Sequence, residues 1–165
     1  MLIVATKVRP RRLVLGLLAA AALLGFLGAG TGVARTAQAA QTAAGVQVDP
    51  TGIRTNQDRL DYLQKWGWLT AEEPASVEEV LLPETFDGAY ADYLALQESQ
   101  GFDLAACAGK TVKRYTYAVT NFPGLQKDVW ASLLVWKKTV VGGEIFCSQG
   151  DGFTLGLAYP QKTGA

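Results

Sequence analysis

The sequence predicts an α+β protein: an N-terminal transmembrane helix, then two helices packed on one face of a four- or five-stranded antiparallel sheet. Three observations support this prediction. Residues 13–34 form a run of 22 residues without a charge. Two segments with helix start and stop signals, near 55–66 and 88–100, follow it. Runs rich in β-branched and aromatic residues, separated by short turns, complete the chain.

The uncharged run at 13–34 is long enough to cross a membrane. As a helix it would measure about 33 Å, against a hydrocarbon core about 30 Å thick. Four bases precede the run and only Arg35 follows it closely, so we expect a single-pass cell-membrane protein with its N-terminus in the cytoplasm and its C-terminal domain outside. The alternative is a signal peptide cleaved near Ala39, which would release a secreted domain.

The predicted organisation has five regions: a cytoplasmic basic segment (1–12), the anchor (13–34), a stalk and linker (35–54), an extracytoplasmic α+β domain (55–160) and a tail (161–165). The part outside the membrane is acidic, because residues 36–165 hold ten Lys or Arg and fifteen Asp or Glu, a net charge of −5. Nucleic-acid binding depends on clustered Lys and Arg, so we expect no nucleic-acid partner.

The composition also limits the chemistry. Histidine is absent, which excludes Ser-His-Asp and Cys-His nucleophile arrangements and removes the commonest metal ligand. The sequence contains no catalytic, cofactor-binding or metal-binding motif that we can identify. A hydrolase would have to work with carboxylates alone, and a glycosidase-type pair must face each other roughly 5–10 Å apart across a cleft.

The first predicted helix begins at Thr55, with Asp58 three residues later as in a capping box. It runs to about Trp66 and ends at Gly67. Its predicted apolar stripe is Leu60, Leu63 and Trp66. A short strand follows at 77–82, between two prolines.

The second predicted helix covers about 88–100, with Asp87 as its N-terminal cap and Gly101 as its end. Its apolar stripe is Tyr90, Tyr93, Leu94 and Leu96. After the helix, we expect Phe102 to enter the core and Asp103 to bond the backbone of the turn.

Four further strands are predicted at 111–120, 129–136, 139–147 and 153–159. The turns between them lie at 121–124, 137–138 and 150–152, and consecutive short turns predict an antiparallel meander. Gly142-Gly143 inside the third of these strands indicates a β-bulge, with a backbone surface for a ligand as the alternative.

The meander also bears on the two cysteines. Export of the domain would favour oxidation of its cysteines to a disulfide. The strand at 139–147, however, is roughly 30 Å long, and this length separates its two ends in the meander. Cys107 precedes the first meander strand and Cys147 ends the third, while a disulfide requires Cα atoms within about 7 Å. We therefore expect no disulfide between Cys107 and Cys147 in one chain.

Four aromatic residues form the candidate binding surface. A hairpin centred on 121–126 would place Tyr117 opposite Trp130, with Tyr115 beside them and Trp136 further along the same face. Flat aromatic rows bind sugar rings or peptides, but they also bury against helices. Both interpretations stay open at this point.

Several short matches occur in order along the chain: Gln97, Gln100-Gly101-Phe102-Asp103-Leu104, Gly109-Lys110-Thr111-Val112, Tyr115-Thr116-Tyr117, Asn121-Phe122-Pro123, Leu133-Leu134-Val135, Gly142-Gly143-Glu144 and Asp151-Gly152-Phe153. Together they resemble the domain-of-unknown-function family 4830, small bacterial proteins often with one N-terminal membrane segment. The resemblance covers about residues 55–160. It implies an extracytoplasmic domain, but no activity and no functional residue. The chain departs from it at Cys107 and Glu144, where tyrosine and aspartate are expected.

The leading interpretation is a membrane-anchored extracytoplasmic domain that serves as a binding or protein-interaction module. Its expected partners are the membrane, through residues 13–34, and an unknown protein or cell-envelope component. The alternatives are a carboxylate-dependent hydrolase of the cell envelope and an accessory subunit of an envelope complex. Two carboxylates converging in a cleft would favour the hydrolase, whereas an exposed aromatic or strand-edge surface would favour the binding module.

Overall fold

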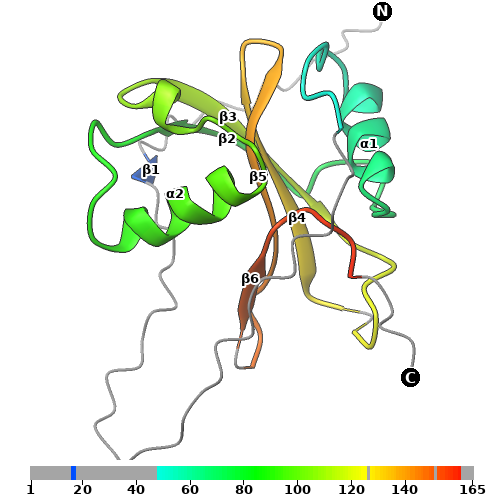
Figure 1. Cartoon of the computed structure of the whole chain (residues 1–165). Coiled ribbons are helices and arrows are strands. Elements are labelled where there is room, and N and C mark those ends of the chain that lie inside the picture. Colours follow the sequence, from blue (N-terminus) through cyan, green and yellow to red (C-terminus); the bar gives the residue numbers. More distant parts are fainter. Residues whose placement is uncertain (1–15, 18–47, 126, 151, 161–165) are drawn as a thin grey trace, which may run out of the picture.

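The computed structural model describes residues 16–17, 48–125, 127–150 and 152–160 (Figure 1). Its elements are β1 (Gly16–Leu17), α1 (Asn56–Lys65), β2 (Ser76–Leu81), α2 (Ala89–Ser99), a 3₁₀ turn (Ala105–Cys107), β3 (Thr111–Ala118), β4 (Val129–Trp136), β5 (Thr139–Cys147) and β6 (Phe153–Leu155). The predicted anchor at 13–34 lies outside the described residues except for β1. Within the described ranges, no helix has the length and apolar character needed to span a membrane.

The sheet follows chain order, β1 to β6, and β2 to β6 form an antiparallel meander. This confirms the predicted antiparallel sheet of four or five strands, in which β3 to β6 are the four strands predicted to form a meander. The two-residue β1 is the exception, since it pairs in parallel with Val80 and Leu81 of β2. The strands predicted at 129–136 and 139–147 agree with β4 and β5 to the residue.

Helix α1 begins and ends where the sequence predicts. The Thr55 hydroxyl accepts the Asp58 N–H at 3.2 Å, and the Asp58 carboxylate accepts the Thr55 N–H at 2.7 Å, which completes the capping box. Gly67, at φ +97°, ends the helix. The predicted apolar stripe is only partly right, because the buried residues of α1 are Arg59, Tyr62 and Leu63.

The fold also includes residues before α1 that the sequence assigns to the linker. The Ile53 N–H donates to the Lys138 carbonyl at 2.9 Å, and the Val140 N–H donates to the Pro50 carbonyl at 2.8 Å. The Ile53 side chain is buried in the core. The chain therefore enters the domain alongside the β4–β5 turn.

Helix α2 matches its predicted range but not its predicted cap. Its N-cap is Gly88, with no side-chain cap, and the Asp87 carboxylate instead accepts the Thr85 hydroxyl at 3.3 Å. The end of the helix is as predicted. Gly101 adopts φ +86°, Phe102 is buried, and Asp103 accepts a backbone N–H from the following turn.

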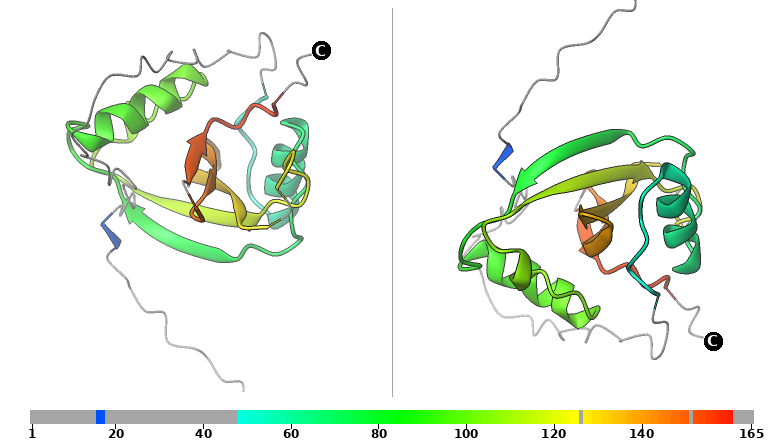
Figure 2. Two further views of the ribbon diagram at one scale, coloured as in Figure 1. Left: turned by 90° about the horizontal axis from the view of Figure 1, so that it is seen from below. Right: turned by 90° about the horizontal axis from the view of Figure 1, so that it is seen from above.

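The two helices lie on opposite faces of β4, so their predicted position on one face is wrong. In β4, residues 129, 131, 133 and 135 belong to the core cluster that includes Tyr62 and Leu63 of α1. Leu134 belongs to a second cluster, against which residues of α2 and Trp136 pack. A strand covered on both faces reads as a continuous apolar run rather than an alternating one, as β4 does. Figure 2 shows α1 and α2 on either side of β5 and β6.

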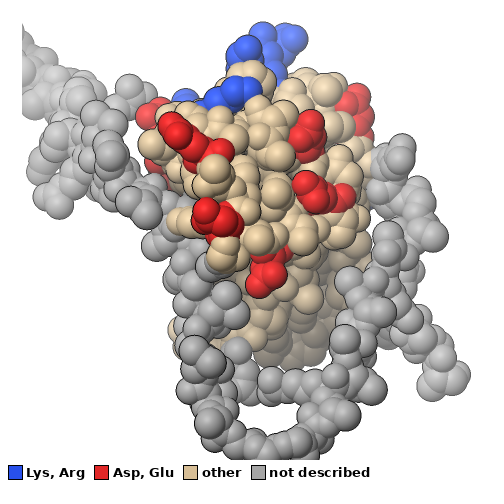
Figure 3. Space-filling view, turned by 60° about the vertical axis from the view of Figure 1, so that its left-hand side comes forward, with Lys and Arg blue, Asp and Glu red and all other residues tan. Residues whose placement is uncertain are grey.

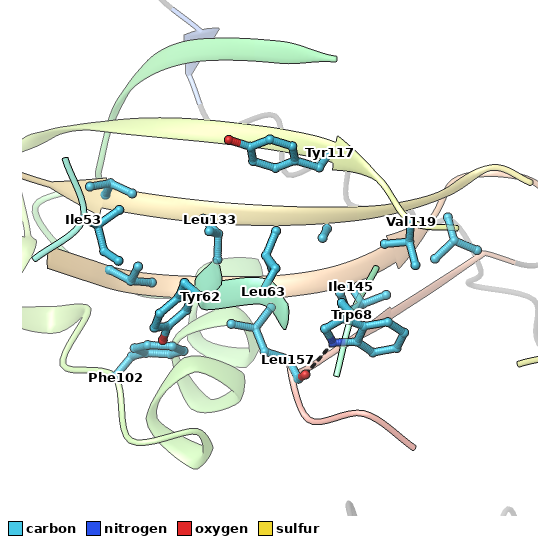
Figure 4. Close-up of a cluster of buried hydrophobic side chains, with 14 of the residues drawn as sticks. Ile53, Tyr62, Leu63, Trp68, Phe102, Tyr117, Val119, Leu133, Ile145 and Leu157 are labelled. Atoms are coloured by element: carbon cyan, nitrogen blue, oxygen red, sulfur yellow. Dashed lines mark hydrogen bonds between the residues drawn. The ribbon is translucent and has the colours of Figure 1, made fainter. Parts of the chain in front are cut away.

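The larger cluster is built around Trp68, Tyr62, Leu63 and Leu157 (Figure 4). The Trp68 indole N–H donates to the Leu157 carbonyl at 2.6 Å. Its ring lies 5.8 Å from that of Phe122 in a stacked arrangement. This cluster fixes α1 and the C-terminal segment against the same face of the sheet.

Strand β5 contains the predicted bulge next to its two glycines. Leu134 pairs with Gly142 and Val135 with Val140, so one residue of β5 is left over. The glycines also permit close approach. A Cβ on Gly143 would lie 2.6 Å from Leu157 Cδ1, and one on Gly142 would lie 3.2 Å from Gln97 Oε1. The surface that a ligand could have used is therefore occupied by the protein's own side chains.

The two cysteines are free and buried. Cys147 lies in the cluster with α1, and Cys107 lies in the cluster with α2. Their separation into different clusters agrees with the expectation that they do not pair.

Candidate functional site

A groove of about 530 Å³ lies beside the start of α1, over neighbouring parts of β2, β3 and β4 and the β4–β5 turn. We call it the basic groove. Its charged lining residues are Arg54, Arg59, Lys113, Lys137, Lys138 and Glu79. The remaining lining is mainly apolar and aromatic, with Ile53, Val135, Tyr115 and Trp136 among its members. Its volume lies within the roughly 300–1,000 Å³ typical of ligand sites.

The basic groove concentrates positive charge in an acidic domain. It holds five of the nine Lys and Arg among the described residues and one acid, a net charge of +4, whereas residues 36–165 carry −5 in total. Figure 3 shows Lys and Arg gathered at the end of the molecule where the β4–β5 turn lies, with Asp and Glu spread over the face below. Across the described ranges, the one ion pair joins Arg114 to Glu78, so no cation of the groove has a carboxylate within ion-pair distance.

Arg59 is the most firmly held of these cations. Its side chain is only 9% exposed. The Arg59 Nε–H donates to the Tyr117 hydroxyl at 2.8 Å, and Nη2 donates to Asn56 Oδ1 at 3.4 Å. The guanidinium carbon lies 3.9 Å from the centre of the Tyr115 ring. Neutral partners therefore orient the guanidinium without neutralising it.

The hydroxyl that orients Arg59 stays protonated over the ordinary pH range. Burial raises the pKa of Tyr117, although the hydrogen bond from Arg59 opposes this. The Tyr117 hydroxyl in turn donates to Asn56 Oδ1 at 2.8 Å. The Arg59 position is thus set by a chain of hydrogen bonds that reaches from α1 to β3.

Trp136 contacts cations through its ring, as Tyr115 contacts Arg59. The ammonium groups of Lys110 and Lys137 each lie 4.3 Å from the centre of its ring system. Tyr115 and Trp136 therefore hold two groove cations, Arg59 and Lys137, through cation–π contacts, and Trp136 also contacts Lys110, which does not line the groove. Their ring faces serve as supports for charge rather than as open platforms for sugar stacking.

The structure does not bring the four predicted aromatic residues onto one face. Tyr117 pairs with Ala131, and Trp130 pairs with Ala118, so the expected pairing of Tyr117 with Trp130 is wrong by one residue. In a strand, one residue of register moves a side chain to the opposite face. Tyr115 and Trp136 both line the basic groove, while Tyr117 is buried beside it and Trp130 is half-buried elsewhere on β4.

Sequence reasoning missed the cations of the site. Lys137 and Lys138 suggested only a turn, and Arg54 and Arg59 come from a segment more than 50 residues away in the chain. Their clustering depends on the pairing of residues 50–53 with the β4–β5 turn, for which the sequence carries no local pattern.

A second polar cluster lies under α2. Glu144 is 8% exposed and Ser132 is buried opposite it on β4. Neither Glu144 Oε2 nor the Ser132 hydroxyl has a hydrogen-bond partner among the described residues. Burial raises the pKa of Glu144, while Tyr93 and Arg114 oppose the rise. Burial and Glu144 together raise the pKa of Tyr93 well above 10.

The buried carboxyl predicts a pH-dependent stability. The folded protein holds the Glu144 proton to a higher pH than the unfolded chain does, for which the ordinary pKa is 4.5. The stability that this carboxyl contributes is therefore complete below about pH 4.5 and falls as the pH rises toward the raised pKa. We expect Glu144→Gln to gain in free energy of unfolding, relative to the parent, as the pH rises from 4.5 upward. Urea titrations of both proteins between pH 4 and 8 measure this difference, and a difference that is constant with pH would contradict the expectation.

Within the described residues, no group of three or more Cys, Asp or Glu side chains is placed to hold a metal ion. No curated protein and no solved structure matches the chain. One protein family does match, over residues 62–145, and it is described as a domain of unknown function. This span is about half of the chain and includes α2, β2 to β4, most of β5 and the C-terminal part of α1. The chain belongs to this family, DUF4830, as its resemblance over residues 55–160 predicts.

Proposed function

We propose that this protein is a membrane-tethered extracytoplasmic binding module and that the basic groove binds an anionic ligand. The observation that carries the proposal is the groove itself, in which five cations and one acid share about 530 Å³ of a domain that is otherwise acidic. The tether and its orientation rest on the uncharged run at 13–34 and the bases before it.

The unpaired state of these cations supports a ligand rather than a structural role. Structural arginines and lysines gain stability from a carboxylate partner, and like charges held together without one repel each other. Arg59 is nearly buried and is oriented only by neutral groups. The guanidinium hydrogens that Tyr117 and Asn56 leave free suit a phosphate or carboxylate, whose oxygens accept charge-assisted hydrogen bonds.

The hydrolase alternative gains no support from this groove. A carboxylate mechanism needs two acids across the cleft, and Glu79 is the one acid among the lining residues. Glu144, the buried carboxyl, belongs to the cluster under α2 instead. The groove offers binding and orientation of an anion, without a second acid for proton transfer.

Titration of the full-length protein in a neutral detergent with tripolyphosphate tests the proposal. We expect calorimetry to detect binding that weakens as the salt concentration rises, because the contacts are charged. Lys113→Gln/Lys137→Gln should bind at least about a hundredfold more weakly, since it removes two charged contacts and each hydrogen bond to a charged group is worth about 1.5–3 kcal/mol.

The matched control is Lys65→Gln/Lys127→Gln, which removes the same charge from exposed positions outside the groove. It should bind like the parent. Equal losses in the two double variants would show a general charge effect and would contradict a site in the groove, as would the absence of binding by the parent.

A further inference from the structure

The chain enters the domain at the rim of the basic groove. Backbone hydrogen bonds join Pro50 to Val140 and Ile53 to Lys138, on the strand and turn that follow Trp136. Ile53 and Arg54 themselves line the groove. The entering segment, cyan in Figure 1, therefore reaches the same end of the domain that carries Lys137 and Lys138.

The connection between the predicted anchor and this end is short. Thirteen residues, 35–47, separate the end of the uncharged run from the described domain. Fully extended, they reach at most about 45 Å, and as a continuous helix they span about 20 Å. A chain anchored through residues 13–34 thus keeps its basic end within a few nanometres of the bilayer.

Charge selects which side of the domain faces that bilayer. The entry end carries Arg54, Lys137 and Lys138, while acids are spread over the face shown below it in Figure 3. An anionic lipid surface attracts each nearby Lys or Arg and repels the acidic face. The half-buried Trp136 at the rim also suits the boundary between headgroups and water, where tryptophan is enriched.

We propose that the basic groove docks on the phosphate headgroups of anionic lipids in the same membrane that holds the anchor. This inference rests on the proposed function and names its ligand. A tether raises the effective concentration of a ligand near its attachment point to about the millimolar range, so individually weak phosphate contacts suffice for docking. Docking holds the domain with its entry end toward the membrane and its β3–β4 turn away from it.

Energy transfer in reconstituted vesicles tests this orientation. Both native cysteines are buried, so a dye can be placed selectively on Thr51→Cys, which is exposed near the groove. The acceptor is a headgroup-labelled lipid, in vesicles of phosphatidylcholine alone or with one-third phosphatidylglycerol. We expect transfer to rise with the anionic lipid and to fall in high salt. A dye on Leu125→Cys, exposed in the β3–β4 turn, should show lower transfer in anionic vesicles.

Charge variants decide whether the groove causes the effect. Lys137→Gln/Lys138→Gln should weaken docking about 25-fold, since each cation near an anionic surface is worth about a factor of five. Lys65→Gln/Lys127→Gln should dock like the parent. Equal transfer in both kinds of vesicle, equal losses in both variants, or failure of the protein to float with vesicles would overturn the inference. If docking fails but the protein still binds tripolyphosphate in detergent, the assignment of lipid as the ligand is wrong and the proposed anion-binding groove is retained. If tripolyphosphate binding is also absent, both proposals are wrong.

Discussion

Replacing Trp68 with alanine should lower the free energy of unfolding by about 3–5 kcal/mol, the range for deletion of a large buried aromatic side chain. Trp68 is 1% exposed, its indole N–H donates to the Leu157 carbonyl, and its ring packs against those of Phe122 and Tyr159. The substitution removes these contacts and leaves a buried carbonyl without its donor. Urea titration of the full-length protein in a neutral detergent, followed by near-ultraviolet circular dichroism, measures the loss.

Trp66→Ala is the matched control, two residues away. The sequence pattern places Trp66 in the core, but the structure leaves it half-buried at the end of α1. We expect a clearly smaller loss of stability than for Trp68→Ala. A larger loss of stability for Trp66→Ala than for Trp68→Ala would contradict the structure, because it would mean that Trp66 is the more deeply buried of the two.

Replacing Gln97 with alanine should cost about 2–4 kcal/mol, from an orphaned buried N–H and the space left by the side chain. Gln97 is fully buried, and its Oε1 accepts the Gly143 N–H at 2.8 Å. Gln100 accompanies it, with Nε2 donating to the Gly143 carbonyl at 3.0 Å and Oε1 accepting the Leu157 N–H at 2.6 Å. These two amides replace a neighbouring strand where β6, which pairs only with 145–147, does not reach. In the parent protein the Gln97 Nε2 group is itself buried without a hydrogen-bond partner. The alanine variant removes this unfavourable group, which offsets part of the loss of stability.

Gln64→Ala provides the comparison, because Gln64 is an exposed glutamine on α1. Its replacement should change the stability by no more than about 0.5 kcal/mol. Hydrogen exchange of the Gly143 amide adds a local readout, and we expect its protection to fall in the Gln97 variant alone. Unchanged protection there would show that Gln97 does not hold the edge of β5.

The sequence predicted only some of the residues that line the basic groove. Tyr115 and Trp136 stood out as aromatic residues on predicted strands, and both line the basic groove. Their role as supports for cations depends on Arg59 and Lys110, which come from α1 and from the loop before β3. Contacts between segments so far apart in the chain leave no periodic pattern in the sequence. The predicted β3–β4 register was wrong by one residue for a different reason. Strand β4 is apolar on both faces, so an alternation of polar and apolar residues could not indicate its register.

From α1 onward, the sequence by itself determined the two α-helices, the five strands and their order. Thr55 and Asp58 mark the start of α1, Gly67 and Gly101 mark helix ends, and short turns order the strands into a meander. These features are local, because caps and turns depend on the φ angles and hydrogen bonds of a few neighbouring residues. The tertiary structure alone decided that α1 and α2 cover opposite faces of β4, and that five cations meet beside the entering chain. Both outcomes follow from burying apolar side chains on each face of β4 and β5, a requirement that depends on total packing and not on any one segment.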